Sequence, residues 1–330
     1  MPSDERAVLV APDSFKGTFR ASEVAAAIGR GLESSLTAAP DLMPVADGGE
    51  GTLEVLLVAL GGETVGVDAS DALRRPIKAG FGLVEDGDTA IVETAQAIGL
   101  PLIDQADRDA EAASSYGAGQ LVAAAAASGA SKVIVAVGGS ASSDGGAGAL
   151  EAINDAGGIG DAQLIVCCDV TTPYELAAEV FGPQKGADAE AVTRLTAQLN
   201  ELATSFKRDP RGVELTGCAG GLSGALWAEH GASLEPGAKF VLAALDADER
   251  INSARAVIVG EGRMDETTLE GKIAAEIAVR ARQAGVPCHA VVGSNGLGPL
   301  DQRILDIQAI IEATTLQEIE SAGKQLTEYL

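Results

Sequence analysis

Histidine and positive charge are scarce in this chain. The 330 residues include only two histidines, His230 and His289, so a histidine-based catalytic triad or metal cluster has little to draw on. Lys and Arg number 23 against 48 Asp and Glu, which gives a formal net charge of −25. Because this charge repels nucleic acid and anionic membrane surfaces, we expect small-molecule partners, with no nucleic acid and no membrane.

Several familiar signals are also missing. The four cysteines show no C-x-x-C spacing, which favours buried thiols over disulfides or a zinc site. The apolar run Leu121–Ala130 is too short to cross a bilayer, and the acidic N-terminal segment does not resemble a secretory signal, so we expect a cytoplasmic protein. Without G-x-x-x-x-G-K-[ST] or a protein-kinase signature, P-loop enzymes and kinases of the protein-kinase fold are excluded.

The most informative stretch of the sequence runs from Ser131 to Gly148 and has the layout of a phosphate-binding loop, which we call the phosphate cradle. Val133–Val137 is apolar and β-branched enough for a strand buried on both faces, and the helix expected after Asp144 would direct its positive end toward the intervening turn. That turn offers N–H and hydroxyl donors from Gly138, Gly139, Ser140, Ser142 and Ser143. We favour a phosphate or carboxylate ligand here over a tight turn without a ligand.

The few cations have an informative placement. Four of them lie in glycine turns: Lys16, Lys185, Arg263 and Lys272. One such residue alone would indicate a solvated surface charge. Four together favour a collective anion site in an otherwise acidic chain.

The first sixty residues contain two strand-loop-helix units. Val8–Ala11 precedes a helix from Ser22 to about Leu36, and Met43–Ala46 precedes a helix over Leu53–Leu60. Because open α/β sheets bind ligands at the carboxyl edge of their strands, we expect one group of polar residues there: Asp13, Ser14, Lys16, Asp47, Glu50 and Thr52. Asp47 and Glu50 could equally cap the second helix, and spacing does not separate a cap from a catalyst.

The pattern then changes and later returns. Short alternating runs over 62–102 predict hairpin strands, while Val257–Val259 resumes the buried strand followed by a glycine turn and a helix. We therefore predict one discontinuous α/β domain, residues 1–66 and 252–330, with an inserted α/β domain of residues 67–251 that contains a mixed sheet. His289 lies in a strand-like run and is expected to be a core residue.

Gly, Ser, Asp and Lys at strand ends of two domains fit phosphoryl transfer better than other common chemistry. That reaction needs positioning and charge neutralisation more than a nucleophile: N–H groups and cations hold phosphates, carboxylates hold Mg²⁺, and one carboxylate accepts the hydroxyl proton. A cleft that closes between the domains would exclude water. The absence of G-x-G-x-x-G after the first strand argues against the competing interpretation, a dinucleotide oxidoreductase.

Seven blocks, in order along nearly the whole chain, resemble the signature blocks of bacterial class I glycerate kinases. They are APDSFKGT (11–18), PVADGGEGT (44–52), SSYGAGQL (114–121), GGSASSDGG (138–146), FGPQKGA (181–187), CAGGL (218–222) and GEGRMDETTLEGK (260–272). The resemblance implies ATP- and Mg²⁺-dependent phosphorylation of D-glycerate. It also implies a flavodoxin-like or Rossmann-like three-layer domain formed by both termini, with an inserted second α/β domain.

Motif position and charge type then suggest roles. Lys16 and Arg263 would bind the glycerate carboxylate or the transferred phosphoryl group, and Asp47 would be the general base. The residues expected to contact substrate are Asp13, Ser14, Glu50 and Ser115. Those expected to contact nucleotide phosphates are Gly138, Gly139, Ser140, Ser142, Gly145 and Lys185. Asp265 or Asp144 would help hold Mg²⁺.

One departure keeps an alternative open. Only Ala147–Ala162 separates the GGSASSDGG block from the following strand, where the family usually carries a longer segment. A catalytically impaired relative that still binds nucleotide or hydroxy acid is therefore the second hypothesis. The 2-phosphorylated product is expected over the 3-phosphorylated one by resemblance alone. The oligomeric state is not determined by the sequence, with a homodimer as one option.

Overall fold

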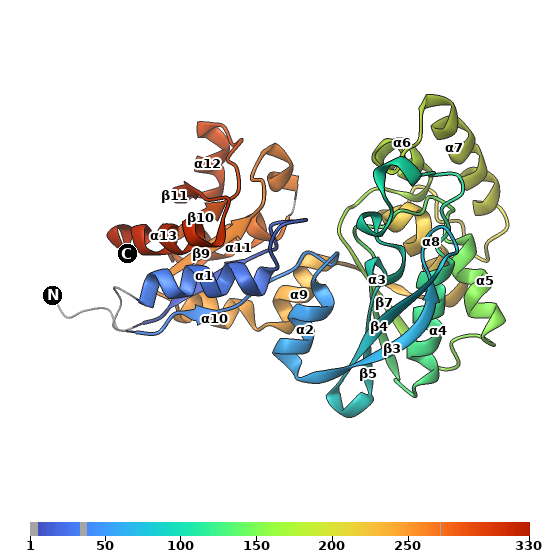
Figure 1. The fold of residues 1–330 in the computed structure, drawn as a ribbon, viewed down its shortest axis with the longest axis horizontal. Helices are drawn as coiled ribbons and strands as arrows, with labels where there is room; N and C mark the ends of the chain where they lie inside the picture. Colours follow the sequence, from blue (N-terminus) through green and yellow to red (C-terminus); the bar gives the residue numbers. More distant parts are fainter. Residues whose placement is uncertain (1–5, 34–37, 271) are drawn as a thin grey trace. The chain divides into compact units, whose positions relative to one another are not determined.

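The protein divides into two compact units in the computed structural model, which describes residues 6–33, 38–270 and 272–330. We call the residues up to Asp47 together with Ala238–Leu330 the terminal unit, and Gly48–Gly237 the central unit. Figure 1 shows the blue N-terminal and red C-terminal elements in one body. Both ends of the chain thus build the terminal unit.

Strands and helices alternate along the terminal unit. Its elements are β1 (Val8–Pro12), α1 (Ala21–Glu33), β2 (Asp41–Leu42), α9 (Gly237–Ala244), α10 (Ala247–Ser253), β9 (Ala256–Glu261), a 3₁₀ turn (Glu266–Glu270), α11 (Ile273–Ala284), β10 (Cys288–Val292), α12 (Pro299–Leu305), β11 (Ile307–Glu312) and α13 (Leu316–Leu326).

The described strands of this unit form one parallel sheet in the order β11-β10-β9-β1-β2. β1 pairs with β9, from the far end of the chain, between Val8↔Ala256 and Pro12↔Gly260. Counted by their order within the unit, the strands run 2-1-3-4-5, which is the order of flavodoxin-like folds. The predicted fold class, a flavodoxin-like domain formed by both termini, is confirmed.

Helices cover both faces of this sheet. Val8 and Val10 of β1 belong to one core with Val24 of α1 and Ile319 of α13. Since side chains alternate along a strand, Leu9 points to the opposite face, and it is also fully buried. α11 packs against β9 as well.

The crossing of α1 and α13 depends on two glycines. A Cβ atom at Gly31 would lie 2.1 Å from the carbonyl oxygen of Glu320, and one at Gly323 would lie 2.5 Å from that of Ile28. The two backbones therefore approach more closely than any side chain would allow.

The central unit begins with a helix and a hairpin. Its elements are α2 (Thr52–Leu60), β3 (Gly62–Ser70), β4 (Pro76–Val84), β5 (Thr89–Glu93), α3 (Ala95–Ile98), α4 (Tyr116–Ala127), β6 (Lys132–Ala136), α5 (Ala147–Asp155), β7 (Gln163–Cys168), α6 (Ala177–Phe181), α7 (Ala189–Ala203), α8 (Cys218–His230) and β8 (Ser233–Pro236).

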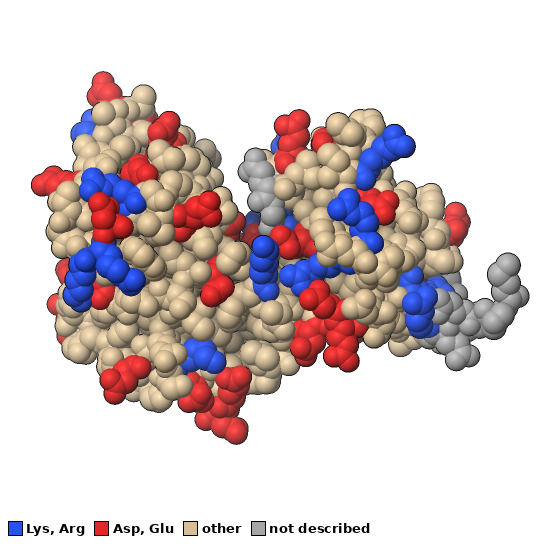
Figure 2. Space-filling view, turned by 180° about the vertical axis from the view of Figure 1, so that it is seen from behind, with Lys and Arg blue, Asp and Glu red and all other residues tan. Residues whose placement is uncertain are grey.

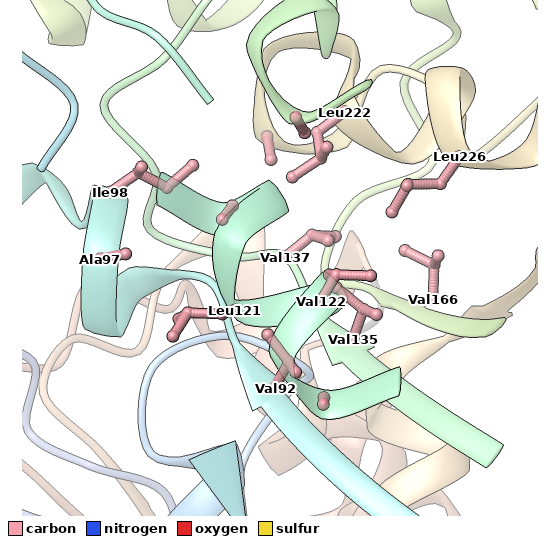
Figure 3. Close-up of a cluster of buried hydrophobic side chains, with 14 of the residues drawn as sticks. Val92, Ala97, Ile98, Leu121, Val122, Val135, Val137, Val166, Leu222 and Leu226 are labelled. Carbon is pink, nitrogen blue, oxygen red and sulfur yellow. The ribbon is translucent and has the colours of Figure 1, made fainter. Parts of the chain in front are cut away.

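The described strands of the central unit form a mixed sheet in the order β3-β4-β5-β6-β7-β8. β3, β4 and β5 are antiparallel neighbours, and β5 to β8 are parallel. Val92, Val135 and Val166 from three of these strands pack toward Leu121 of α4 and Leu226 of α8 (Figure 3). The predicted mixed sheet and its hairpin strands are confirmed.

α2 packs within the central unit, although the sequence-based boundary at 66/67 assigned it to the terminal domain. A Cβ at Gly82 of β4 would lie 2.8 Å from Leu53, so the glycine makes room for the helix. The Glu93 carboxylate accepts hydrogen bonds from the N–H groups of Gly51 and Leu53, both at 3.0 Å. The boundary in the structure accordingly falls at Asp47/Gly48, and the second, expected at 251/252, falls at Gly237/Ala238.

Two element boundaries also differ from expectation. α1 begins at Ala21 rather than Ser22, and Glu23 accepts a hydrogen bond from the Arg20 N–H at 2.9 Å. The expected end near Leu36 lies outside the described residues. β2 ends before the expected strand at 43–46, but Met43 N–H still bonds to Val10 at 2.8 Å, so the chain continues along β1.

Two predictions about scarce residue types are confirmed. The four cysteines are buried free thiols, and His289 is fully buried in β10. Among the described helices, none has the length and apolar character required to cross a bilayer. On the face drawn in Figure 2, Lys and Arg lie among Asp and Glu rather than in a broad basic patch. Several of the cations form exposed ion pairs with neighbouring carboxylates, such as Arg194–Glu111 and Arg74–Glu151.

We expect Gly323→Ala to destabilise the protein by about 1–3 kcal/mol, because the new methyl group would force α1 and α13 apart. Urea unfolding measures the change. Gly29→Ala in α1 is the matched control: its Cβ would meet only the side chains of Leu42 and Pro40, so a change within about 1 kcal/mol is expected. Equal effects of the two substitutions would contradict the role of the close crossing.

Candidate active site

The terminal unit contains a cavity of about 440 Å³ at the carboxyl edge of its sheet. We call it the terminal cavity. Loops after β1, β9, β10 and β11 build it, and β1 and β9 are the strands at which the strand order reverses, the usual ligand position in such sheets. Its lining residues are Asp13, Ser14, Phe15, Lys16, Thr18, Asp47, Glu261, Gly262, Arg263, Lys272, Gly293, Ser294 and Thr314.

Five of the predicted catalytic and substrate-binding residues line this one cavity: Asp13, Ser14, Lys16, Asp47 and Arg263. Lys16 Nζ donates to Asp47 Oδ2 at 3.0 Å. Arg263 Nε lies 2.8 Å from Asp265 Oδ2, which places the predicted metal ligand beside the cavity. The structure therefore brings a carboxylate and a cation into contact at the expected sheet edge.

Asp13 is the most perturbed carboxyl group of the terminal cavity. Asp13 is 7% exposed. Burial raises the pKa of its carboxyl group to about 8, and the nearby Asp47 carboxylate adds to this effect. Lys16 and the hydrogen bond from Ser14 N–H, at 2.6 Å, oppose that shift. Burial therefore favours the protonated form of the Asp13 carboxyl group.

Glu261 and Lys272 also line the terminal cavity, and the sequence predicted no role for Glu261. Glu261 is the last residue of β9, and burial raises the pKa of its carboxyl group. Lys272 is one of the four glycine-turn cations for which the sequence predicts a collective anion site. The signal that could have found Glu261 is its position at the carboxyl end of a fully buried strand, the same signal that identified Asp13.

A second, smaller cavity of about 140 Å³ lies in the central unit, beside the predicted phosphate cradle. We call it the central cavity. Gly139 and Ser140 after β6 and Asp169 after β7 supply polar groups, together with Gln184 and Lys185. Apolar residues complete the wall: Leu100, Val137, Val170, Phe181 and Ala219.

Lys185 is a buried cation in this wall, only 4% exposed. Its ammonium donates to Ser142 O at 2.6 Å and to Ser140 Oγ at 3.3 Å. No carboxylate of the described residues lies within ion-pairing distance of it. Burial lowers the pKa of Lys185 to about 8, even though Asp169 and Asp144 act in the opposite direction. An anion in the cavity would compensate this buried charge and accept the third N–H.

Other residues of the predicted cradle hold the loop together. Gly145 has φ +67°, and a Cβ there would lie 2.3 Å from Tyr174 Oη, which donates to Gly145 O at 2.9 Å. A Cβ at Gly138 would lie 2.8 Å from Asp169 Oδ2. Ser142 is fully buried and donates to Ala219 O at 3.5 Å. Gly139, Ser140 and Lys185 are thus the predicted nucleotide-binding residues that line the central cavity.

Asp144 and Ser115 are bonded to each other. Asp144 Oδ2 accepts hydrogen bonds from Ser115 N at 2.7 Å, Ser115 Oγ at 2.9 Å and Gly148 N at 3.1 Å, while its Oδ1 accepts one from Gly146 N at 3.1 Å. Ser115 is fully buried. These bonds fasten the start of α4 to the start of α5.

Glu50 belongs to a different unit from Asp13 and Ser14. Glu50 is exposed, lies in the central unit before α2, and is absent from the lining of the terminal cavity. Within the described part of the chain, no cluster of three or more His, Cys, Asp or Glu could hold a metal ion by itself.

These features define an α/β protein of two units, each with a cation in a cavity at the carboxyl ends of parallel strands. The family model for the glycerate kinase family matches residues 8–157 and 156–330. The chain belongs to the glycerate kinase family.

Named relatives cover most of the chain. It is 35% identical to "Glycerate 2-kinase" of Escherichia coli K12, over 91% of this chain and 88% of that protein. It is 36% identical to "Glycerate kinase" of Halalkalibacterium halodurans, over 88% and 86% of the two chains. A crystal structure from Salmonella typhimurium LT2, of a protein provisionally assigned as glycerate kinase 2, matches with a TM-score of 0.81 and 29% identity, over 99% and 98% of the two chains.

Asp13→Asn should stabilise the ligand-free protein at alkaline pH. The pKa of Asp13 rises from its ordinary 3.8 to about 8 on folding, so the folded state binds the extra proton and wild-type stability falls as pH rises from about 4 to 8. Relative to the wild type, the free energy of unfolding of the variant should be unchanged near pH 4 and higher by more than about 1 kcal/mol at pH 8. Thermal unfolding at a series of pH values measures this difference, and a pH-independent difference would contradict the buried, protonated Asp13.

Lys185→Met should weaken binding of a phosphate-bearing ligand at least about tenfold, because charge-assisted hydrogen bonds are lost. Calorimetric titration with ADP measures the change. Lys78→Met, at an exposed cation of the same unit, is the control and should bind ADP as the wild type does. Unchanged ADP affinity in Lys185→Met would contradict the predicted role of Lys185 in binding phosphate.

Proposed function

We propose that this protein is a kinase that transfers the γ-phosphoryl group of ATP to a hydroxyl of D-glycerate, with Mg²⁺, and forms 2-phosphoglycerate. Membership of the glycerate kinase family and the names of its relatives support the substrate class. The observation that carries the proposal is the Lys16–Asp47 pair at the ligand-binding edge of the terminal sheet. It combines a proton acceptor with a cation for an anionic substrate.

In this proposal the two aspartates of the terminal cavity have different tasks. Asp13 is protonated at neutral pH and can donate a hydrogen bond to substrate. Asp47, ion-paired with Lys16, accepts the proton of the attacking hydroxyl. Ser14, whose buried Oγ has no hydrogen-bond partner among the described residues, can bind a substrate oxygen. Arg263 can bind the carboxylate or the transferred group.

Asp265 suits the proposed magnesium ion better than Asp144. Five hydrogen bonds with N–H and O–H donors already occupy the Asp144 carboxylate. Asp265 Oδ2 contacts Arg263 and retains a second lone pair, and Mg²⁺ commonly takes one or two carboxylates together with phosphate oxygens. When bound, the ion would neutralise charge on the phosphates.

For the nucleotide, we propose that Gly139, Ser140 and Lys185 bind phosphate oxygens in the central cavity. The volume of about 140 Å³ suits phosphate groups rather than a whole nucleotide, since pockets for larger ligands typically measure about 300–1,000 Å³. Transfer then requires both ligands to meet, and we propose that it occurs in a cleft that closes between the two domains and excludes water.

A coupled assay of ADP release, with and without D-glycerate, tests the function. Release that depends on D-glycerate is expected, and NMR of the product should show phosphate on the 2-hydroxyl. Binding of ADP without any glycerate-dependent release would instead support the impaired relative.

Asp47→Asn should lower kcat by about 10² or more while leaving the protein folded, because the base is lost and the shape is kept. Asp13→Asn should retain more activity, since the amide resembles the protonated acid that it replaces. Steady-state kinetics and thermal unfolding of both variants measure this contrast. Near-normal turnover in Asp47→Asn would remove Asp47 from the role of base.

A further inference from the structure

Lys272 lies at the N-terminal end of helix α11 and lines the terminal cavity. It is the residue before α11, and its side chain is 38% exposed. Its ammonium lies 3.5 Å from Glu261 Oε2, longer than the roughly 2.7–2.9 Å of a strong charge-assisted hydrogen bond. Glu261 is its one polar partner among the described residues, so two of its three donors are available to a ligand.

Glu261, in turn, is held in place by Thr268. The Glu261 carboxylate is buried at the end of β9, and Oε1 accepts a hydrogen bond from Thr268 Oγ1 at 2.9 Å. Thr268 is fully buried, so this bond is protected from water. A buried carboxylate has few alternative partners, and the threonine hydroxyl thereby determines which way the oxygen facing Lys272 points.

The Thr268 hydroxyl also anchors the loop that follows β9. Thr268 Oγ1 accepts a hydrogen bond from Asp265 N at 3.1 Å, and the Asp265 carboxylate contacts Arg263. The Thr268 hydroxyl thus connects the segment that contains Arg263 with the Glu261 carboxylate that contacts Lys272.

We propose that Lys272 is a further binding residue for an anionic oxygen group in the terminal cavity, and that Thr268 is the positioning residue that holds it there through Glu261. This inference rests on the proposed kinase function. The group is either the carboxylate of the acid substrate or a phosphate of the nucleotide. Both are anionic oxygens that an ammonium group and the start of a helix can bind.

Lys272→Gln should raise the KM for one of the two substrates about tenfold or more, and the substrate affected identifies the group. Thr268→Val keeps the shape of the residue but removes the hydroxyl, and should raise the same KM severalfold with a smaller change in kcat. Thr268→Ser retains the hydroxyl and should restore near wild-type values. The matched controls are Lys324→Gln, at an exposed position of α13, and Thr327→Val, at a half-buried position just after that helix, and both should leave the two KM values unchanged.

A double-mutant cycle decides whether Thr268 acts through Lys272. If it does, Thr268→Val in the Lys272→Gln background should raise that KM no further, because the positioned ammonium is already gone. Additive effects would show that Thr268 acts only on general stability and would overturn the positioning role. An unchanged KM for both substrates in Lys272→Gln would overturn the binding role.

Calorimetric titration with ADP and with D-glycerate separates failure of this inference from failure of the proposed function. A wild-type protein that binds either compound without turnover would refute the kinase function, and weaker binding by Lys272→Gln would still support the anion site. Unchanged binding in Lys272→Gln, or no binding of either probe by the wild type, would overturn the inference.

Discussion

The pairing of β1 with β9 is the interaction on which the terminal unit depends. It joins strands that are more than two hundred residues apart in sequence, from Val8↔Ala256 to Pro12↔Gly260. Because the two strands are parallel, the loops that leave them emerge on the same edge, one with Asp13 and Lys16 and the other with Glu261 and Arg263. Removing this pairing would separate the two halves of the terminal cavity.

The second constraint is charge. A chain with a net charge of −25 must create local sites for anions, and it does so in two different ways. In the terminal cavity, cations lie directly beside carboxylates, as in Lys16–Asp47 and Lys272–Glu261. In the central cavity, Lys185 is buried without a carboxylate at ion-pairing distance among the described residues, so its charge is open to a ligand. The two cavities thus hold their cations in two different electrostatic settings.

Much of the fold could be predicted because local signals and tertiary structure agree. Buried β-branched runs ending in glycine turns predicted β1, β6 and β9, and the motif blocks predicted the family. Roles within the loops were harder to predict. Asp144 and Ser115 lie in separate motifs, and only the fold shows that they bond to each other. Gly145 was expected to contact phosphate, yet its missing side chain makes room for Tyr174.

By itself, the sequence determined the class of fold, the order of its elements and the family, because hydrophobic periodicity, glycine turns and motif order are properties of short segments. Only the tertiary structure decided which polar groups share a cavity and which are already bonded to protein. It placed Glu261 and Lys272 in one cavity with Lys16, whereas Glu50 belongs to the central unit. Burial and partner choice depend on strands and loops that are distant in sequence, so no local pattern can contain them.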